Sequence, residues 1–399
     1  MEKTPWSPER VTLTYYDRAA ERFGLSWYTA AAGSPAIRCA VGGGDVTRGT
    51  IVPCTVSEGL QGFQNTGVLS LPPETDCVYQ VGDAAAGVWS APAPLRRRVP
   101  AGGSFTFLFM SDTQDGEYRG AMWARALSEA LRAYPEAAFL IHGGDIVDTG
   151  CDAAQWRDML AFGAPWTRSL PMLPASGNHS YWDCYLSGED RIEARHFHID
   201  LPPQDTRHGL YYLVEYGDCL FLVMNSGDVV EPGAAMTPQQ LAWVEAELAA
   251  TTKPWRLAMI HNPLYSPGKY GSRPDRNLEA RNLRAQLNGL FARYQVQLCM
   301  CGHDHVYMRT HPVDGDGRPG AEGTVHFMPG CAGIQCRPPE ELSASEAAVF
   351  AEYFGTRHRQ ASFAAVEVSP HRLTVRYHTV DCAAPTAPTV PERTFVIER

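Results

Sequence analysis

The stretch Phe105-Thr106-Phe107-Leu108-Phe109-Met110-Ser111-Asp112-Thr113-Gln114 decides the fold. Its first six residues are almost continuously apolar, which is expected of a β-strand buried on both faces. Asp112 and Gln114 follow directly. In layered α/β folds, ligands bind beyond the carboxyl ends of the strands. We therefore expect a functional site at this strand end and look for other strands that end in polar residues.

Downstream of this stretch, apolar runs alternate with amphipathic segments, which predicts an α/β fold for residues 101–399. Strands are predicted near residues 138–141, 220–223, 257–260, 296–300, 364–368 and 373–377. Helices are predicted near residues 119–132, 152–162 and 281–294. A further helix is predicted to begin at Thr237-Pro238-Gln239-Gln240, with Thr237 as the cap, Pro238 at the first position and Gln240 closing a capping box.

Upstream, residues 1–100 read as a separate all-β domain. Short alternating segments are separated by turn residues, near residues 12–15, 25–28, 66–71 and 77–81. Regularly spaced short strands predict a β-sandwich of the immunoglobulin or fibronectin-III type. Residues 91–103, which are rich in Pro, Ala and Gly, are predicted to be a linker.

Five predicted strand ends carry side chains that can bind a metal or transfer a proton. They are Asp112 with Gln114, Asp145, Asn178 with His179, His261, and His303 with His305. Carboxylate, imidazole and amide oxygen suit divalent Mn, Fe or Zn. Two such ions lie about 3.5–4 Å apart in known two-metal sites, so one carboxylate has to bridge them. The pattern therefore indicates a centre for two divalent metal ions.

These motifs resemble the calcineurin-like metallophosphoesterase superfamily. The resemblance rests on Asp112-x-Gln114, Gly144-Asp145, Gly177-Asn178-His179, His261 and Gly302-His303-Asp304-His305. Residues 73–82 and 302–310 are similar to the purple acid phosphatase branch, which has a fibronectin-type-III-like N-terminal domain. The resemblance covers nearly the whole chain and implies a four-layer α/β/β/α domain after the sandwich.

The resemblance also implies a ligand set. Asp112, Asp145 and His305 would hold the first metal. Asn178, His261 and His303 would hold the second, with Asp145 bridging. A metal-bridging hydroxide would then attack phosphorus in line with the leaving group. His179 would protonate that group or steady the phosphoryl oxygens.

Two positions depart from the family pattern. Asp148 stands where purple acid phosphatases have a ligand Tyr, and Gln114 stands where many other members have His. Gln114 would either coordinate through its amide oxygen or hydrogen-bond a metal-bound water. Asp148 is expected to support a metal-bound His. We therefore expect a colourless divalent centre with weaker affinity at its first site.

Several other residues invite a functional and a structural interpretation. Lys269, Arg273 and Arg276 lie in a Gly- and Pro-rich loop and would either bind substrate phosphate or remain solvated. We expect structural roles for the remaining His residues, which are His142, His196, His198, His311 and His326. Four cysteines could form a zinc site, namely Cys299, Cys301, Cys331 and Cys336. We expect Cys299 and Cys301, which lie in a predicted strand, to be buried core residues instead. Tyr181 and Trp182 would stack on an aromatic leaving group or simply pack.

Bulk composition narrows the choice of partner. The 399 residues carry a formal net charge of −10, which argues against nucleic acid and leaves a small phosphorylated substrate. No membrane span is apparent, and the first residues lack a signal-peptide pattern. The 11 Cys show no dense disulfide spacing. We expect a cytoplasmic protein as written, or a secreted or periplasmic one if a leader was removed.

The sequence thus favours hydrolysis of phosphate monoesters. A phosphodiesterase or nucleotide pyrophosphatase with the same centre is the alternative. A binding module with a degenerate metal site is a second alternative, prompted by the changes at Gln114 and Asp148.

Overall fold

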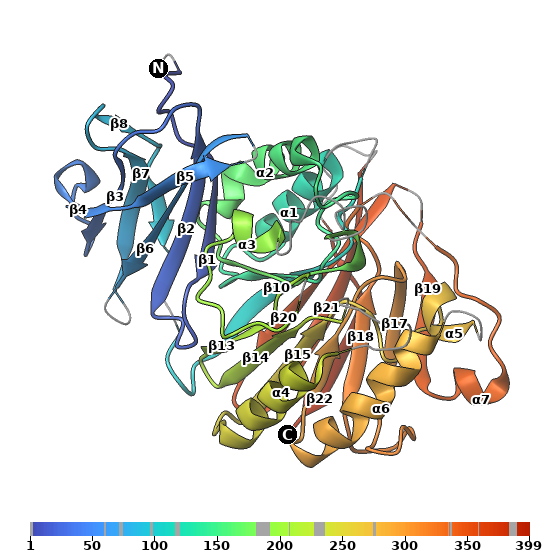
Figure 1. Ribbon diagram of the computed structural model, residues 1–399. Coiled ribbons are helices and arrows are strands. Elements are labelled where there is room, and N and C mark those ends of the chain that lie inside the picture. Colours follow the sequence, from blue (N-terminus) through green and yellow to red (C-terminus); the bar gives the residue numbers. More distant parts are fainter. Residues whose placement is uncertain are drawn as a thin grey trace.

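The computed structural model describes residues 3–399 except 60, 72–74, 96–98, 116–119, 181–191, 207, 227–235, 274–276, 334, 336, 358 and 383–388. Its N-terminal part is an all-β sandwich of two antiparallel sheets (Figure 1). One sheet has the order β1(Glu9–Tyr15), β2(Arg22–Thr29), β6(Gly62–Ser70), β5(Thr55–Gly59). The other has the order β4(Thr50–Pro53), β3(Pro35–Val41), β7(Cys77–Asp83), β8(Val88–Trp89), with β9(Ala93–Leu95) on β7. The short 3-10 helix η1(Val46–Arg48) follows β3.

The linker predicted for residues 91–103 is wrong in its first part, because β9 pairs with β7 there. Ala93 and Leu95 are buried, whereas Pro94 between them is exposed. This alternation is the two-residue period of a strand. The Pro- and Ala-rich composition hid a short strand, since Pro is tolerated in a sheet only where its missing donor is not needed. The division between domains at residue 100 stays a prediction.

The rest of the chain forms two further sheets. The six-stranded sheet has the order β12(Met172–Pro174), β11(Leu140–His142), β10(Phe105–Met110), β20(Gln360–Val368), β21(Arg372–Asp381), β22(Pro391–Glu398). The seven-stranded sheet has the order β13(Tyr212–Tyr216), β14(Cys219–Met224), β15(Trp255–Ile260), β16(Leu298–Met300), β18(Val325–Pro329), β17(Val306–Thr310), β19(Phe350–Gly355). Strands β10, β11 and β12 run parallel to one another, as do β14, β15 and β16.

Helices cover the outer face of each of these sheets (Figure 1). The helices are α1(Ala121–Ala133), α2(Ala153–Thr167), α3(Ile192–His196), α4(Pro238–Ala250), α5(Lys269–Ser272), α6(Leu278–Arg293), α7(Ala344–Ala347) and the 3-10 helix η2(Asn178–Ser180). In β10, Phe107 and Phe109 pack between the two sheets, whereas Leu108 and Met110 pack against α1 and α2. On the other side, α4 and α6 pack on the seven-stranded sheet. The order helix, sheet, sheet, helix is the expected four-layer arrangement.

Helix α4 begins as predicted, but its cap differs from the prediction. Thr237 accepts a hydrogen bond from Gln240 N at 3.2 Å, and Pro238 is the first helical residue. The predicted capping box is wrong, because the Gln240 side chain turns inward. It accepts from Asn225 N at 2.9 Å and donates to Asn225 O at 3.0 Å. Gln240 therefore ties the helix to the end of β14 instead of closing its own cap.

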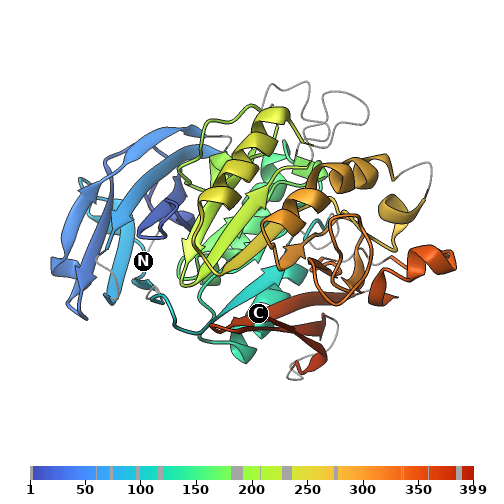
Figure 2. The same cartoon turned by 90° about the horizontal axis from the view of Figure 1, so that it is seen from below.

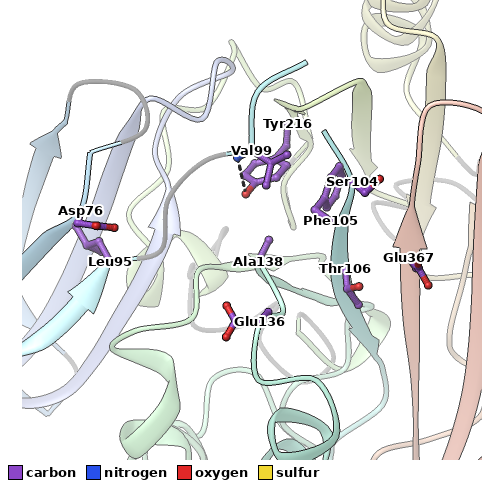
Figure 3. A pocket seen from close by; sticks show the side chains of 10 residues that line it. All are labelled: Asp76, Leu95, Val99, Ser104, Phe105, Thr106, Glu136, Ala138, Tyr216 and Glu367. Carbon is purple, nitrogen blue, oxygen red and sulfur yellow. Dashed lines mark hydrogen bonds between the residues drawn. The ribbon is translucent and has the colours of Figure 1, made fainter. Parts of the chain in front are cut away.

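In both views the sandwich stands at one end of the molecule, next to the layered part (Figures 1 and 2). A cavity of about 610 Å³ lies at this junction, lined by Asp76, Leu95, Phe105 and Tyr216 among others (Figure 3). Phe105 begins β10, so the cavity lies at the opposite end of that strand from Asp112. In the described part of the chain, no helix is long and apolar enough to cross a bilayer.

Candidate metal centre

The loops that follow the parallel strands are tied together by backbone hydrogen bonds. Asp112 N donates to Gly144 O at 3.1 Å, which joins the loop after β10 to the loop after β11. Gly302 N donates to His261 O at 3.0 Å, which joins the loops after β15 and β16. Gly144 has φ +97°, and a Cβ there would lie 2.6 Å from His261 Nδ1, so only Gly fits. The strand ends therefore form one compact edge.

Backbone strain is concentrated at this edge. Asp112, Asp145, His303 and His305 have φ of 56°, 50°, 77° and 56°. They are four of the eight non-glycine residues with positive φ in the part of the chain that the structure describes. A left-handed conformation at a non-glycine residue costs on the order of 1–3 kcal/mol and persists where a functional arrangement requires it. The concentration of strain here makes this edge the candidate functional site.

Two His side chains and one Asn side chain form a tight group with Asp145. His261 Nε2 lies 3.1 Å from Asp145 Oδ2 and 3.3 Å from Asn178 Oδ1. His303 Nδ1 donates to Asn178 Oδ1 at 2.7 Å. Ligand atoms of Asp145, His261 and His303 lie within 4.8 Å of one another, and all three residues are buried. Their donor types and spacing fit one divalent cation.

A second group also contacts Asp145. His305 Nε2 lies 3.3 Å from Asp112 Oδ1. Gln114 Nε2 lies 3.3 Å from His305 Nε2 and 3.4 Å from Asp145 Oδ2. The Gln114 amide oxygen is buried and has no hydrogen-bond partner among the described residues. Asp145 thus contacts both groups, and the Gln114 amide lies between Asp145 and His305.

Two of the His rings are oriented as metal ligands usually are. His261 Nδ1 donates to Gly143 O and His305 Nδ1 donates to Gln335 O, each at 2.8 Å. These bonds turn the Nε2 atom of each ring toward the carboxylates. A backbone carbonyl that holds the outer ring nitrogen is a common support for a metal-binding His.

Charges within the cluster shift its proton affinities in opposite directions. Burial alone would raise the pKa of both Asp112 and Asp145. The pKa of Asp112 is nevertheless below the ordinary carboxyl value, because His305 and His261 favour its charged form. The pKa of Asp145 is also lowered, because His261 favours its charged form. Burial opposes protonation of His261, yet Asp145 and Asp112 raise its pKa to about 9. Burial and the His261 charge lower the pKa of His303 to about 4. A metal ion bound by His261 would therefore have to displace a proton.

His179 lies beside this cluster with a support of its own. Its backbone N donates to Asp145 Oδ1 at 2.8 Å, and its Nε2 lies 4.0 Å from Asp145 Oδ2. Its Nδ1 donates to Asp148 O at 2.7 Å and lies 3.6 Å from Asp148 Oδ1. The structure therefore pairs Asp148 with His179, whereas the sequence predicted that it would support a metal-bound His.

The two predicted substrate-binding cations lie in and after α5. Lys269 Nζ lies 5.4 Å from the centroid of the Tyr270 ring, and that ring lies 4.5 Å from the His303 ring. Lys269 is therefore near the second metal group. Arg273 is the exposed C-cap of α5, one turn farther along.

Sequence reasoning missed three residues near His303. Asp304 is fully buried and accepts from Tyr270 N at 3.0 Å and Gly271 N at 3.1 Å, so it fixes the loop that carries α5. Arg337 donates to His303 O at 3.3 Å and lies 5.6 Å from the Tyr270 ring centroid. In the sequence, Tyr270 could have been noticed only as an aromatic residue nine positions after His261. No local pattern pointed to Arg337.

Most of the remaining His and Cys residues have structural positions. His142 is in β11, as expected, and its Nε2 lies 2.9 Å from Thr113 Oγ1. His196 is the buried last residue of α3. Cys299 and Cys301 are fully buried, and no Cys joins a metal-competent group among the described residues. Tyr181, Trp182, Arg276, Cys336 and residues 73–74 of the sandwich motif lie outside the described residues.

Residues 105–307, which contain all the strand-end residues above, match the family model of the calcineurin-like phosphoesterases. The chain belongs to the calcineurin-like phosphoesterase family. This family uses divalent metals, and its members are generally phosphatases.

Several known proteins resemble the chain over larger or smaller parts. The purple acid phosphatase PPD1 from yellow lupin seeds superposes with a TM-score of 0.75 over 99% of this chain and 75% of its own, and the 17% identity shows a common fold. The probable inactive purple acid phosphatase 24 of Arabidopsis thaliana is 26% identical over 54% of this chain and 37% of its own. A nucleotide pyrophosphatase/phosphodiesterase of Hordeum vulgare is 28% identical over 44% of this chain and 49% of its own. The chain thus spans half or less of the length of these curated relatives.

Proposed function

We propose that this member of the family is a two-metal hydrolase of phosphate monoesters. The observation that carries the proposal is the double contact of Asp145. Its carboxylate lies 3.1 Å from His261 Nε2 in one group and 3.4 Å from Gln114 Nε2 in the other. A carboxylate between two ligand groups is what a bridged pair of cations requires.

We assign the ligands from these contacts. The first metal would be held by Asp112, Gln114, Asp145 and His305, and the second by Asp145, Asn178, His261 and His303. The donor set of oxygen and imidazole nitrogen fits Mn, Fe or Zn in the divalent state. The position taken by Tyr in purple acid phosphatases is Asp148 here, which faces His179. We therefore propose a colourless centre.

When bound, the two cations would supply charge stabilisation for the phosphoryl oxygens and an activated water. The protein's own residues have the other tasks. Asp145 orients His179 through its backbone N, and Asp148 O holds Nδ1 so that Nε2 faces the metal-ligand cluster. His179 Nε2 would pass a proton to the leaving oxygen. Lys269, Arg273 and the amide of Asn178 would contact the phosphate.

The natural substrate would be small, because a net charge of −10 disfavours long polyanions such as nucleic acid. The purple-acid-phosphatase-like fold supports a monoesterase. The barley relative's name supports the alternative, a phosphodiesterase or nucleotide pyrophosphatase with the same centre. The two differ in what occupies the leaving-group side of the site.

The test combines metal analysis with a substrate comparison. Protein purified without chelator is analysed for Mn, Fe and Zn, then assayed on p-nitrophenyl phosphate and bis-p-nitrophenyl phosphate with each metal. We expect up to two metal ions per chain and a higher kcat/KM for the monoester. Asp145→Asn should abolish both metal binding and turnover, whereas His311→Asn, an exposed control, should change neither.

A second candidate is a non-catalytic binding module, which the name of the Arabidopsis relative supports. Faster diester turnover would replace our first choice with the diesterase. Metal-free protein that hydrolyses neither ester with added Mn²⁺, Fe²⁺ or Zn²⁺ would establish the binding module instead.

A further inference from the structure

Glu193 is a buried carboxyl that the proposed reaction does not use. It lies in α3 and has no exposed surface. Neither of its oxygens has a hydrogen bond of ordinary geometry among the described residues. Burial raises its pKa to about 7, against the hydroxyls of Ser180 and Ser176, which favour the charged form. A buried carboxyl of this kind is costly, so its position needs a reason.

The two serines flank the turn that carries Asn178 and His179. Ser180 Oγ accepts a hydrogen bond from Gly177 N at 3.2 Å. Ser176 Oγ accepts from Leu210 N at 3.1 Å. A hydroxyl that accepts one hydrogen bond still carries a proton that it can donate. Both hydroxyls are near enough to Glu193 to favour its charged form, so this carboxyl can receive a hydrogen bond from each end of the turn.

Helix α3 is in turn held by the N-terminal sandwich. Thr12 Oγ1 of β1 donates to His196 O at 2.8 Å. Tyr28 OH of β2 lies 2.6 Å from His196 Nδ1. The His196 ring stacks on Trp156 of α2, with the centroids 4.1 Å apart. The backbone that presents Glu193 is therefore fixed by the sandwich on one side and by α2 on the other.

We propose that Glu193 is a positioning residue for the metal-ligand turn, and that it couples the N-terminal sandwich to the metal centre. The turn matters because Asn178 Oδ1 lies 2.7 Å from His303 Nδ1 and 3.3 Å from His261 Nε2, so a small displacement changes the second metal's ligand set. Supports of this kind typically change metal affinity or activity by about 10–100-fold when removed. The expected change in turnover rests on the proposed function, whereas the expected change in metal affinity can be measured without any turnover.

The experiment compares Glu193→Ala, Glu193→Gln and a matched control in the full-length protein. Calorimetric titration with Zn²⁺ or Mn²⁺ measures metal affinity, and p-nitrophenyl phosphate hydrolysis measures kcat and KM. Glu193→Ala should weaken metal binding and lower kcat by about 10–100-fold with little change in KM. Glu193→Gln keeps an oxygen that can accept from a hydroxyl and should recover most of both. The control is Glu129→Ala, another buried helix glutamate, paired with Arg125 and Arg132. It should lower stability without changing metal affinity or kcat.

Folded Glu193→Ala with wild-type metal affinity and kcat overturns the proposal, as does an equal defect in Glu129→Ala. If Glu193→Ala does not fold, Ser180→Ala decides, because it removes the hydroxyl from the other side of the contact. It should show the same loss of affinity and kcat, and wild-type values would overturn the proposal. If the wild-type protein binds metal but hydrolyses no ester, the proposed hydrolase function is refuted, and the metal affinities of wild type and Glu193→Ala still decide the role of Glu193. Wild-type protein that binds no metal refutes both proposals.

Discussion

Replacing the buried His196 should make the stability of the protein less sensitive to acid. The ring lies between Trp156 and the Tyr28 hydroxyl. Burial, together with the charges of Arg10 and Arg195, lowers its pKa to about 3. In the unfolded chain a histidine has a pKa of about 6.5. Between these values the unfolded state binds a proton that the folded state excludes, so stability falls as the pH falls.

The size of the effect follows from the two pKa values. At pH 7 both states carry a mostly neutral ring, and proton linkage at this position costs only about 0.2 kcal/mol. At pH 5 the unfolded ring is almost fully protonated, and the cost reaches about 2 kcal/mol. The cost continues to grow until the pH approaches the folded pKa of about 3. The acid-labile contribution of this residue between pH 7 and pH 5 is therefore about 2 kcal/mol.

The assay is urea unfolding of metal-free protein at pH 7 and pH 5, for wild type and His196→Gln. The variant should be less stable at pH 7, because it loses the stacking on Trp156, yet it should lose about 2 kcal/mol less than wild type on going to pH 5. His311→Gln, at an exposed position, is the control and should show the wild-type difference. Equal losses in wild type and His196→Gln would refute the reasoning.

Three further outcomes test the metal centre. His179→Ala should lower kcat by about 10²–10⁴-fold and leave the metal content unchanged, and loss of metal in elemental analysis would contradict its role in proton transfer. Gln114→His should tighten binding of the first metal, because imidazole is a better ligand for these cations than an amide; unchanged affinity by calorimetry would show that this position does not coordinate. Gly302→Ala would place a Cβ 2.1 Å from Ser111 Oγ and 2.5 Å from Asp112 Oδ2. It should weaken the first site while leaving circular dichroism unchanged, and an unaffected metal titration would refute this close approach.

The sequence contained enough to locate the strand ends that build the candidate site. Phe105–Met110 is apolar on both faces because it packs between sheets on one side and against helices on the other. Such a run is recognisable without knowing its neighbours. Asp112, Asp145 and His261 follow runs of this kind, and parallel strands bring their carboxyl ends to one edge. A local pattern and one general rule of α/β folds therefore predicted which side chains would meet.

The sequence could not predict which of several possible hydrogen-bond or ion-pair partners a side chain would contact. Gln240 has the right position for a capping box, but the backbone of Asn225 offers it two hydrogen bonds inside the fold. Asp148 was expected to support a metal-bound His, but its neighbour in space is His179. In each case two interactions were chemically possible, and the nearer and better aligned partner in the folded chain decided the outcome.

The sequence thus determined which side chains make up the candidate metal-ligand groups. The tertiary structure decided which residues hold those side chains in place. Gln114 meets His305 across 191 positions of the chain, and Thr12 meets His196 across 184. Contacts between residues so far apart in the chain produce no periodic or local pattern in the sequence, because the partners meet only when the sheets and the sandwich pack. Glu193 is an example, since an isolated glutamate in a short helix looks solvated until the surrounding elements bury it beside the turn of Asn178.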